Sequence, residues 1–281
     1  MTMAGSKGAA AAPDRYELAC EAASRLSLPL EPAELATLAS DHDMGEAELS
    51  AIAVTLDYLA EKRRLSSIET LLRLSRLPRK EPKTFDNFDF SRIRGRDADA
   101  LSKLPALADL YAGRNVAFMG PGGVGKTHLA QAYGRECCLR GLKTYYIKAS
   151  ELKDRLGSAV ERGNASRVVG ALVKPSCLII DEVGRCEFDK ACTDLLFDVV
   201  DRRYEKEGPN TMILTSNVVA SEWRKFFTGD DTLLCTLDRI FDRASVFVMS
   251  GPSYRGRELD TYSVEAAPQA TKTRGTRPIA P

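Results

Sequence analysis

Residues 120–127 read GPGGVGKT and form the phosphate-binding pattern G-x-x-x-x-G-K-[ST]. Glycines in such a loop let successive backbone N–H groups turn inward around phosphate oxygens. Lys126 can then reach the β and γ oxygens, and the Thr127 hydroxyl can ligate Mg²⁺. The alternative is a glycine-rich turn without a ligand. We predict a nucleoside triphosphate site made of Gly120, Pro121, Gly122, Gly123, Val124, Gly125, Lys126, Thr127 and His128.

The segments on either side of this loop are those that a working phosphate site needs. The apolar run 116–119 predicts a buried strand, and residues 128–139 predict a helix. A helix that begins at the loop adds the positive end of its dipole, which favours an anionic phosphate. This strand–loop–helix context separates the pattern from a chance match.

A second chemical motif lies further along the chain, after a strand predicted at 143–147. The apolar strand 177–182 ends in Asp181 and Glu182. Asp181 would hold Mg²⁺ through water, and Glu182 would polarise the attacking water. Each carboxylate taken alone is open to another interpretation, an ordinary charge at a strand end. The strand inserted between the two motifs, with Glu beside Asp, favours an ATPase that moves protein parts over a small-molecule kinase.

A polar residue follows the next predicted strand, at 211–215. Asn217 comes directly after Ser216 at the end of that strand. A polar side chain at this position can lie between the acidic pair and the γ-phosphate. Asn217 is therefore the candidate sensor of the nucleotide, and we group it with Lys126 and Glu182 as a catalytic residue.

Composition is consistent with a cytoplasmic globular protein. The 281 residues suffice for one α/β domain and a smaller module, with 44% hydrophobic and 28% charged residues. No apolar run approaches the roughly 20 residues that span a bilayer, and residues 1–13 lack the apolar stretch of a signal peptide. The seven cysteines form no C-x-x-C pair, which fits a reducing compartment. We expect no membrane partner and a disordered tail at 1–13.

The net charge of +1 is unevenly distributed over the first part of the chain. Residues 14–61 are acidic, and their apolar spacing predicts helices at 15–26, 32–40 and 45–61. Residues 62–83 are strongly basic and contain a further amphipathic helix that extends to Leu77 and stops at Pro78. Such a basic face is either a solvated surface or a salt-dependent contact with a phosphate backbone.

Composition also suggests domain boundaries. We predict a small helical domain at 14–82, a linker at 83–90, a nucleotide domain at 91–260 and a tail at 261–281. The linker contains Phe85, Phe88 and Phe90, which must be buried and would pin it onto the nucleotide domain. The folded sequence after Asn217 is too short for a three-helix lid.

Seven segments in consistent order resemble one protein family. They are GPGGVGKTHLA, LIIDEVG, LLFDVVDRRYE, ILTSN, SEWRKFF, LDRIFDRA and GPSYR. Together they resemble the AAA+ ATPases of the IstB type, which are helpers encoded beside insertion-sequence transposases. They are less closely similar to the DnaC and DnaI helicase loaders. The resemblance covers residues 83–259 and implies an α/β P-loop fold: a five-stranded parallel sheet in a three-layer sandwich, without a C-terminal lid and preceded by a small all-α domain.

The resemblance also implies an ATP- and Mg²⁺-dependent homo-oligomer on DNA. Such a protein would select or remodel target DNA and recruit or stimulate its cognate transposase. Each nucleotide would be completed in trans by an arginine of the next subunit. Arg239 matches that finger, and Arg243 is the reserve. The alternative for both arginines is a surface salt bridge with Asp238 or Asp242. Arg255 would contact nucleotide within its own subunit.

The segment between the second strand and the acidic pair is where initiator-like members of this superfamily carry DNA-contacting helices. By that resemblance, contacts with duplex DNA would be largely independent of sequence. A plain surface of mixed charge is the alternative. The candidate residues are Lys148, Ser150, Lys153 and Arg155, and the segment continues to Arg162 and Arg167.

Two other functions remain open at this point. A helicase loader would prefer single strands to duplex DNA and would not be encoded beside a transposase. A metabolic P-loop kinase would transfer phosphate to a small acceptor instead of water.

Overall fold

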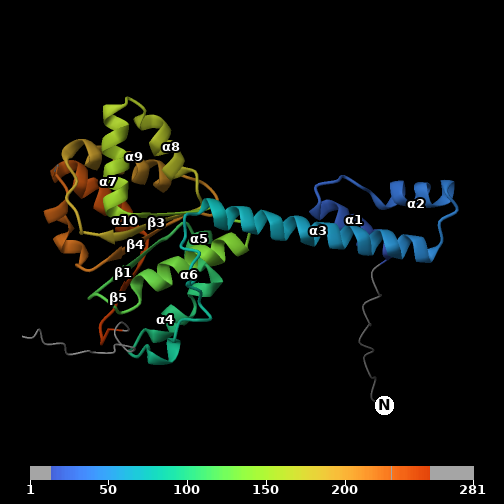
Figure 1. Ribbon diagram of the computed structural model, residues 1–281, viewed down its shortest axis with the longest axis horizontal. Coiled ribbons are helices and arrows are strands. Elements are labelled where there is room, and N and C mark those ends of the chain that lie inside the picture. Colours follow the sequence, from blue (N-terminus) through green and yellow to red (C-terminus); the bar gives the residue numbers. More distant parts are fainter. Residues whose placement is uncertain (1–13, 229, 254–281) are drawn as a thin grey trace, which may run out of the picture.

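The computed structural model describes residues 14–228 and 230–253. Figure 1 shows two parts, a group of helices at one end and an α/β part at the other, joined by a long helix. The predicted tails at 1–13 and 261–281, the residue Arg255 and the stretch where a lid would follow lie outside the described residues.

The α/β part is built on a five-stranded parallel sheet, as the family resemblance implied. The strand order is β2-β3-β4-β1-β5, so β1 lies between β4 and β5. Because all strands are parallel, their carboxyl ends meet at one edge of the sheet, where ligands bind in open α/β folds. The strands are β1 (Asn115–Met119), β2 (Thr144–Lys148), β3 (Cys177–Val183), β4 (Thr211–Ser216) and β5 (Ala244–Val248).

Helices cover both faces of the sheet and make the predicted three-layer sandwich (Figure 1). Alternate residues of each strand point to opposite faces. Val116 and Phe118 therefore pack with α6 (Lys126–Leu139), whereas Ala117 and Met119 belong to the core on the other face. That second face is covered by α7 (Ala149–Glu161), α8 (Ala165–Val173), α9 (Lys190–Tyr204) and α10 (Asp230–Asp242).

Short helices lie in the connections. Before β1 come η1 (Phe90–Arg92), α4 (Ala98–Ser102), η2 (Leu104–Ala106) and α5 (Ala108–Tyr111), and η3 (Ala220–Phe226) follows β4. No helix within the described ranges 14–228 and 230–253 has the length and apolar character needed to cross a membrane.

The amino-terminal helices are α1 (Arg15–Arg25), α2 (Pro32–Asp41) and α3 (Glu46–Leu74). They share a small core that includes Ala19, Leu35 and Leu49. The expectation of two separate helices after residue 45 is wrong, because α3 is continuous over 29 residues. No glycine or proline interrupts that stretch. The expected extension to Leu77 is also wrong, since Arg76 has φ of +62° and Pro78 disfavours helical backbone before it.

The end of α3 is attached to the edge of the sheet at β2. The Tyr146 backbone N–H donates to the Ser75 carbonyl at 2.8 Å, and Leu77 is buried in the core beneath α6. Arg76 hydrogen-bonds the Tyr145 hydroxyl at 2.9 Å and pairs with Glu151 of α7. The amino-terminal helices are thus connected directly to β2 and α7.

The linker is held against the nucleotide domain, as its phenylalanines predicted. Phe88 is buried in the core with Val124 and Tyr133, and Phe85 and Phe90 are partly buried beside it. The Thr84 carbonyl lies 2.9 Å from His128 Nε2 at the start of α6. Burial lowers the pKa of His128, so a neutral ring meets this carbonyl near pH 7.

Arg203 of α9 orders the segment that leads into β3. Its buried guanidinium donates to the carbonyls of Pro175 at 2.8 Å and Thr211 at 2.7 Å, among others. Arginine has five N–H donors in a planar fork, so one side chain can satisfy several carbonyls. This contact fixes the entry of the strand that carries the acidic pair.

Candidate nucleotide-binding site

The phosphate loop joins β1 to α6 at the carboxyl edge of the sheet. Gly125 is the N-cap of α6 with φ of +97°, so the helix begins at Lys126. The buried Lys126 ammonium donates to the carbonyls of Gly120 at 2.7 Å and Pro121 at 2.6 Å. The helix amino terminus and the lysine therefore face the cradle in which a phosphate would lie.

Two glycines of this loop are required by close contacts. A Cβ at Gly120, where φ is +138°, would lie 1.9 Å from the Met249 carbonyl oxygen. A Cβ at Gly125 would lie 2.8 Å from the Phe88 ring. The end of β5 and the linker thus both rest directly on the loop, and its shape depends on them.

The structure brings Thr127 and Asp181 together, although they are 54 positions apart in the sequence. The Thr127 hydroxyl donates to Asp181 Oδ1 at 2.9 Å, and the carboxylate is 1% exposed. Hydroxyl and carboxylate oxygens are the ligands that Mg²⁺ takes in nucleotide sites. The pair therefore fits a magnesium ion beside the phosphate loop.

Two further hydroxyls hold the same carboxylate, and the sequence reasoning missed both. Thr215 of β4 donates to Asp181 Oδ1, and Tyr146 of β2 donates to Oδ2 at 2.6 Å. Burial and the neighbouring carboxylate raise the pKa of Tyr146, so its hydroxyl stays protonated and can donate. The sequence did contain a signal for Thr215, because it is a polar residue in an otherwise apolar strand. Nothing in the sequence distinguished Tyr146 from its neighbour Tyr145.

We predict that Tyr146→Phe weakens the binding of Mg²⁺ by about tenfold, since a hydrogen bond to a buried charged group is worth roughly 1.5–3 kcal/mol. Titration of Mg²⁺ against nucleotide binding measures the effect. Tyr145→Phe is the matched control, because its hydroxyl bonds Arg76 on the other side of β2. An unchanged Mg²⁺ dependence in Tyr146→Phe would show that the other two hydroxyls suffice to orient Asp181.

Glu182 stands beside Asp181 in an unusual backbone conformation. Its φ is +62°, and its N–H donates to the Thr215 hydroxyl at 3.0 Å. The carboxylate, which is 27% exposed, pairs with Arg185 at 2.6 Å and with Lys148 at 3.7 Å. Strained backbone of this kind persists where surrounding contacts over-determine it, and it is common at functional sites.

Asn217 follows β4, which lies between β3 and β1 in the sheet. Ser216, the last residue of β4, is paired with Met119 of β1 on one side and Val183 of β3 on the other. The side chain of Asn217 is exposed at this edge. Its place fits the sensor role that the sequence predicted.

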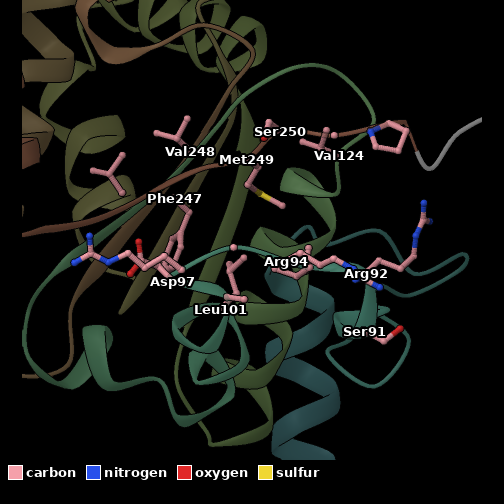
Figure 2. A pocket seen from close by; sticks show the side chains of 17 residues that line it. Ser91, Arg92, Arg94, Asp97, Leu101, Val124, Phe247, Val248, Met249 and Ser250 are labelled. Carbon is pink, nitrogen blue, oxygen red and sulfur yellow. The ribbon is translucent and has the colours of Figure 1, made fainter.

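A large cavity opens beside the phosphate loop, with a volume of about 810 Å³ (Figure 2). The loop 91–98 lines one side, and residues 246–252 line another. Val124 of the phosphate loop and Leu101 of α4 complete the lining. Apolar and polar groups are both present in its lining, as in pockets that bind small molecules.

Arg239 lies on a different part of the domain. It lines a smaller cavity, of about 240 Å³, together with Asn115. Asn115 begins β1, whereas the phosphate loop follows the end of that strand. Arg239 therefore lies near the amino edge of the sheet, away from the phosphate loop of its own chain.

The partner of Arg239 differs from both aspartates considered from the sequence. Its Nε pairs with Asp201 of α9 at 2.9 Å, and its guanidinium lies 5.1 Å from the Phe197 ring centroid. Arg243 is more exposed and lies 3.7 Å from Asp242. Of the salt bridges left open by the sequence, Arg243 thus makes the one with Asp242. Arg239 pairs with Asp201 instead, because α10 packs against α9.

The four DNA candidates occupy different environments. Lys148 ends β2 and Ser150 is exposed in the first turn of α7, while Lys153 is partly buried. Arg155 bonds the Tyr145 hydroxyl and stacks on that ring at 5.4 Å. Arg155 therefore packs against Tyr145, and DNA contact by any of the four residues stays a prediction.

Comparison with known proteins agrees with this geometry. Residues 27–261 match the model of the IstB-like ATP binding protein family. A Geobacillus stearothermophilus protein of insertion sequence IS5376, named as ATP-binding, is 37% identical over 83% of this chain and 92% of its own. A similarly named Pseudomonas aeruginosa protein of insertion sequence IS21 is 31% identical over 78% of this chain and 80% of its own.

A solved structure supports the fold. AMPPCP-bound DnaA from Aquifex aeolicus aligns with a TM-score of 0.51 and 21% identity, over 62% of this chain and 51% of that one. It shares the AAA+ nucleotide fold, in which a five-stranded parallel sheet carries the phosphate loop. With a family match that spans most of its length, the chain belongs to the IstB-like ATP-binding proteins.

Proposed function

We propose that this protein is a Mg²⁺-dependent ATPase that assembles on duplex DNA and assists transposition. The observation that carries the proposal is the bond between Thr127 and Asp181 beside Lys126, which supports a phosphate site and a metal site at the same edge of the sheet. The relatives belong to insertion sequences, and this supports the context of transposition. In that context the protein would select or remodel target DNA and recruit a transposase.

The nucleotide would occupy the loop and the neighbouring cavity. Phosphates would lie against the loop, with Mg²⁺ held by Thr127 and Asp181. Glu182 would orient the attacking water, and Asn217 would contact the γ-phosphate. The base would lie in the cavity beside Val124. We also propose that Arg255 contacts the nucleotide from the same subunit.

The position of Arg239 supports a homo-oligomer. Since it lies near the amino edge of the sheet, it cannot complete its own phosphate site without a large rearrangement. In a stack of subunits, Arg239 would instead enter the phosphate site of the neighbouring subunit. In such a homo-oligomer Arg239 would act as the finger that stabilises charge in the transition state.

The DNA contacts would be made to the backbone. Lys148 at the end of β2 and Ser150, Lys153 and Arg155 of α7 would provide three cations and a hydroxyl, without a base-reading pattern. Binding to duplex DNA would therefore be largely independent of sequence and would weaken as salt is raised.

Lys126→Ala tests the link between nucleotide and DNA. Loss of a buried charged contact should weaken ATP binding by roughly 100-fold and prevent stable assembly on duplex DNA. Fluorescent-nucleotide titration and gel-shift assays with duplex and single strands measure both steps. Lys190→Ala is the control, because that exposed lysine pairs only with Asp194 among the described residues. Tight duplex binding by Lys126→Ala without nucleotide would contradict the link, and a preference for single strands would favour a helicase loader.

A further inference from the structure

Trp223 is the only tryptophan of the chain, and it is almost completely buried. It belongs to η3, the short helix that follows β4 and precedes α10 in the chain. An indole N–H can only donate, so a buried one needs an acceptor. Here the acceptor is the hydroxyl of Ser216, the last residue of β4, whose oxygen lies 3.1 Å from Trp223 Nε1. The tryptophan is thereby tied to the end of the strand that leads to the candidate sensor.

The Ser216 hydroxyl uses its whole capacity for hydrogen bonds at this point. It donates to the Val183 carbonyl of β3 at 2.8 Å, and it accepts from the Val218 N–H at 3.1 Å and from Trp223. A hydroxyl has one proton and two lone pairs, so all of them are engaged. Because Ser216 and Val218 flank Asn217, this one hydroxyl fixes the backbone on both sides of the sensor.

The indole ring makes a second contact, with α10. Its centroid lies 5.5 Å from that of the Phe241 ring, and the two planes are inclined by 51°. Aromatic pairs at this separation attract one another beyond the effect of burial alone. Phe241 comes two positions after Arg239, and residues two apart point to nearly opposite sides of a helix. Phe241 therefore holds α10 at the core and leaves Arg239 facing away from it.

The far end of η3 is also attached to the domain. The Phe188 N–H donates to the Phe226 carbonyl at 2.7 Å, and the Thr228 N–H donates to the Phe188 carbonyl at 3.0 Å. The Phe188 and Phe227 rings lie 5.0 Å apart. Close-packed interiors have low compressibility, so a displacement at one end of such a segment reaches its neighbours.

We propose that Trp223 is a positioning residue with two tasks. Its N–H holds Asn217 in place through Ser216, and its ring passes a displacement of Asn217 to α10 and thereby to Arg239. A γ-phosphate bound by Asn217 in one subunit would then adjust the arginine that the same subunit offers to its neighbour. This inference rests on the proposed function and names how neighbouring sites would be coordinated.

The first experiment compares Trp223→Phe with Tyr133→Phe in nucleotide affinity and in DNA-stimulated hydrolysis. Trp223→Phe keeps a ring but loses the N–H. Its ATP affinity should stay close to that of wild type, while kcat falls about fivefold, the factor for one neutral hydrogen bond of ordinary net strength. In an Asn217→Ala background the same substitution should have no further effect on kcat, because both changes act on one contact.

Tyr133→Phe is the matched control for loss of a buried hydrogen bond. The Tyr133 hydroxyl accepts from the Leu110 N–H at 3.1 Å, the same length as the bond of Trp223, and lies in the core on the other face of the sheet. This variant should keep the kcat of wild type. Thermal unfolding of both variants shows whether the two losses affect stability alike.

The second experiment uses Trp223 as a reporter and leaves it unsubstituted. Since the chain has no other tryptophan, the tryptophan emission of the full-length protein comes from this one site. Emission should differ between protein saturated with a non-hydrolysable ATP analogue and protein saturated with ADP, because only the analogue has a γ-phosphate. Asn217→Ala should remove the difference although both nucleotides still bind. Phe241→Leu should keep it, because the bond to Ser216 remains.

A third experiment tests the contact with α10 in mixed assemblies. A Lys126→Ala subunit can lend Arg239 to a neighbour that carries Arg239→Ala, and the mixture then hydrolyses ATP. Adding Phe241→Leu to the Lys126→Ala subunit should lower this restored hydrolysis by about fivefold, which lies within the range for one aromatic pair. Only the subunit that donates the arginine is changed, so the loss reports on the placement of α10.

The outcomes separate this inference from the proposed function. If duplex DNA stimulates hydrolysis but emission is the same with both nucleotides, the link to Asn217 is overturned and the proposed function stands. An additive loss of kcat in the Asn217→Ala background also overturns it, since Trp223 would then only support the fold. Undiminished restoration by the Phe241→Leu subunit overturns the link to α10. If the wild type neither hydrolyses ATP nor binds duplex, the proposed function fails and this inference fails with it.

Discussion

Arg239→Ala is expected to bind ATP almost normally yet to lose DNA-stimulated hydrolysis by roughly 10³- to 10⁵-fold, the contribution of an arginine finger. The two effects separate because the phosphate loop of the variant is intact, whereas the arginine would serve the adjacent subunit. Folding should be little affected, since the Arg239–Asp201 pair is partly exposed and such pairs contribute at most about 1 kcal/mol. Nucleotide titration and steady-state hydrolysis with duplex DNA measure the two quantities.

Mixing of variants tests whether this arginine acts in trans. Lys126→Ala is expected to be inactive alone but still carries Arg239. Wherever the two variants are neighbours in an assembly, it should restore hydrolysis in the pockets of Arg239→Ala. Two inactive proteins would then give an active mixture. Lys126→Ala is not expected to assemble on DNA by itself, but it should join ATP-bound Arg239→Ala subunits through the interface to which it contributes Arg239. Sedimentation of the mixture on DNA checks this.

Arg243→Ala is the natural comparison, because Arg243 lines the same small cavity one helical turn further along the chain. Wild-type activity in Arg239→Ala would remove Arg239 as the finger and point to Arg243. Loss of ATP binding in Arg239→Ala would instead place the residue in its own subunit's pocket, against the geometry described above.

Glu182→Gln should keep ATP and Mg²⁺ bound but slow hydrolysis by roughly 10²- to 10⁴-fold, the usual contribution of a general base. The carboxamide has the shape of the carboxylate but cannot accept the proton of the attacking water. Complexes with DNA and ATP should therefore last longer, which a competitor chase with labelled duplex can measure. Single-turnover hydrolysis gives the chemical step separately from product release.

Glu187→Gln provides the control for this substitution, since Glu187 is an exposed carboxylate only five positions further along the chain. Turnover at the wild-type rate in Glu182→Gln would assign the catalytic role to another group. A loss of nucleotide binding would instead indicate that the charge of Glu182 mainly balances Lys148 and Arg185.

The sequence by itself determined those features that depend on short-range pattern. The phosphate loop could be read from eight consecutive residues, because its glycines, lysine and threonine act within one turn of chain. The strand carrying Asp181 and Glu182 was visible because a strand buried on both faces is a continuous apolar run. The order of the motifs and the resemblance of seven segments then led to a parallel AAA+ sheet, which the structure confirms.

Only the tertiary structure decided which side chains meet across the sheet and between helices. Asp181 is held by hydroxyls from α6, β2 and β4, whose sequence separations range from 34 to 54 positions. Arg239 pairs with Asp201 because α10 packs on α9. The sequence of neither helix indicates that the other will pack against it. The cluster of Lys148, Glu182 and Arg185 likewise depends on β2 and β3 lying side by side. Strand order and helix packing are set by burial over the whole domain, so a local pattern can predict an element but not the residue that it will contact.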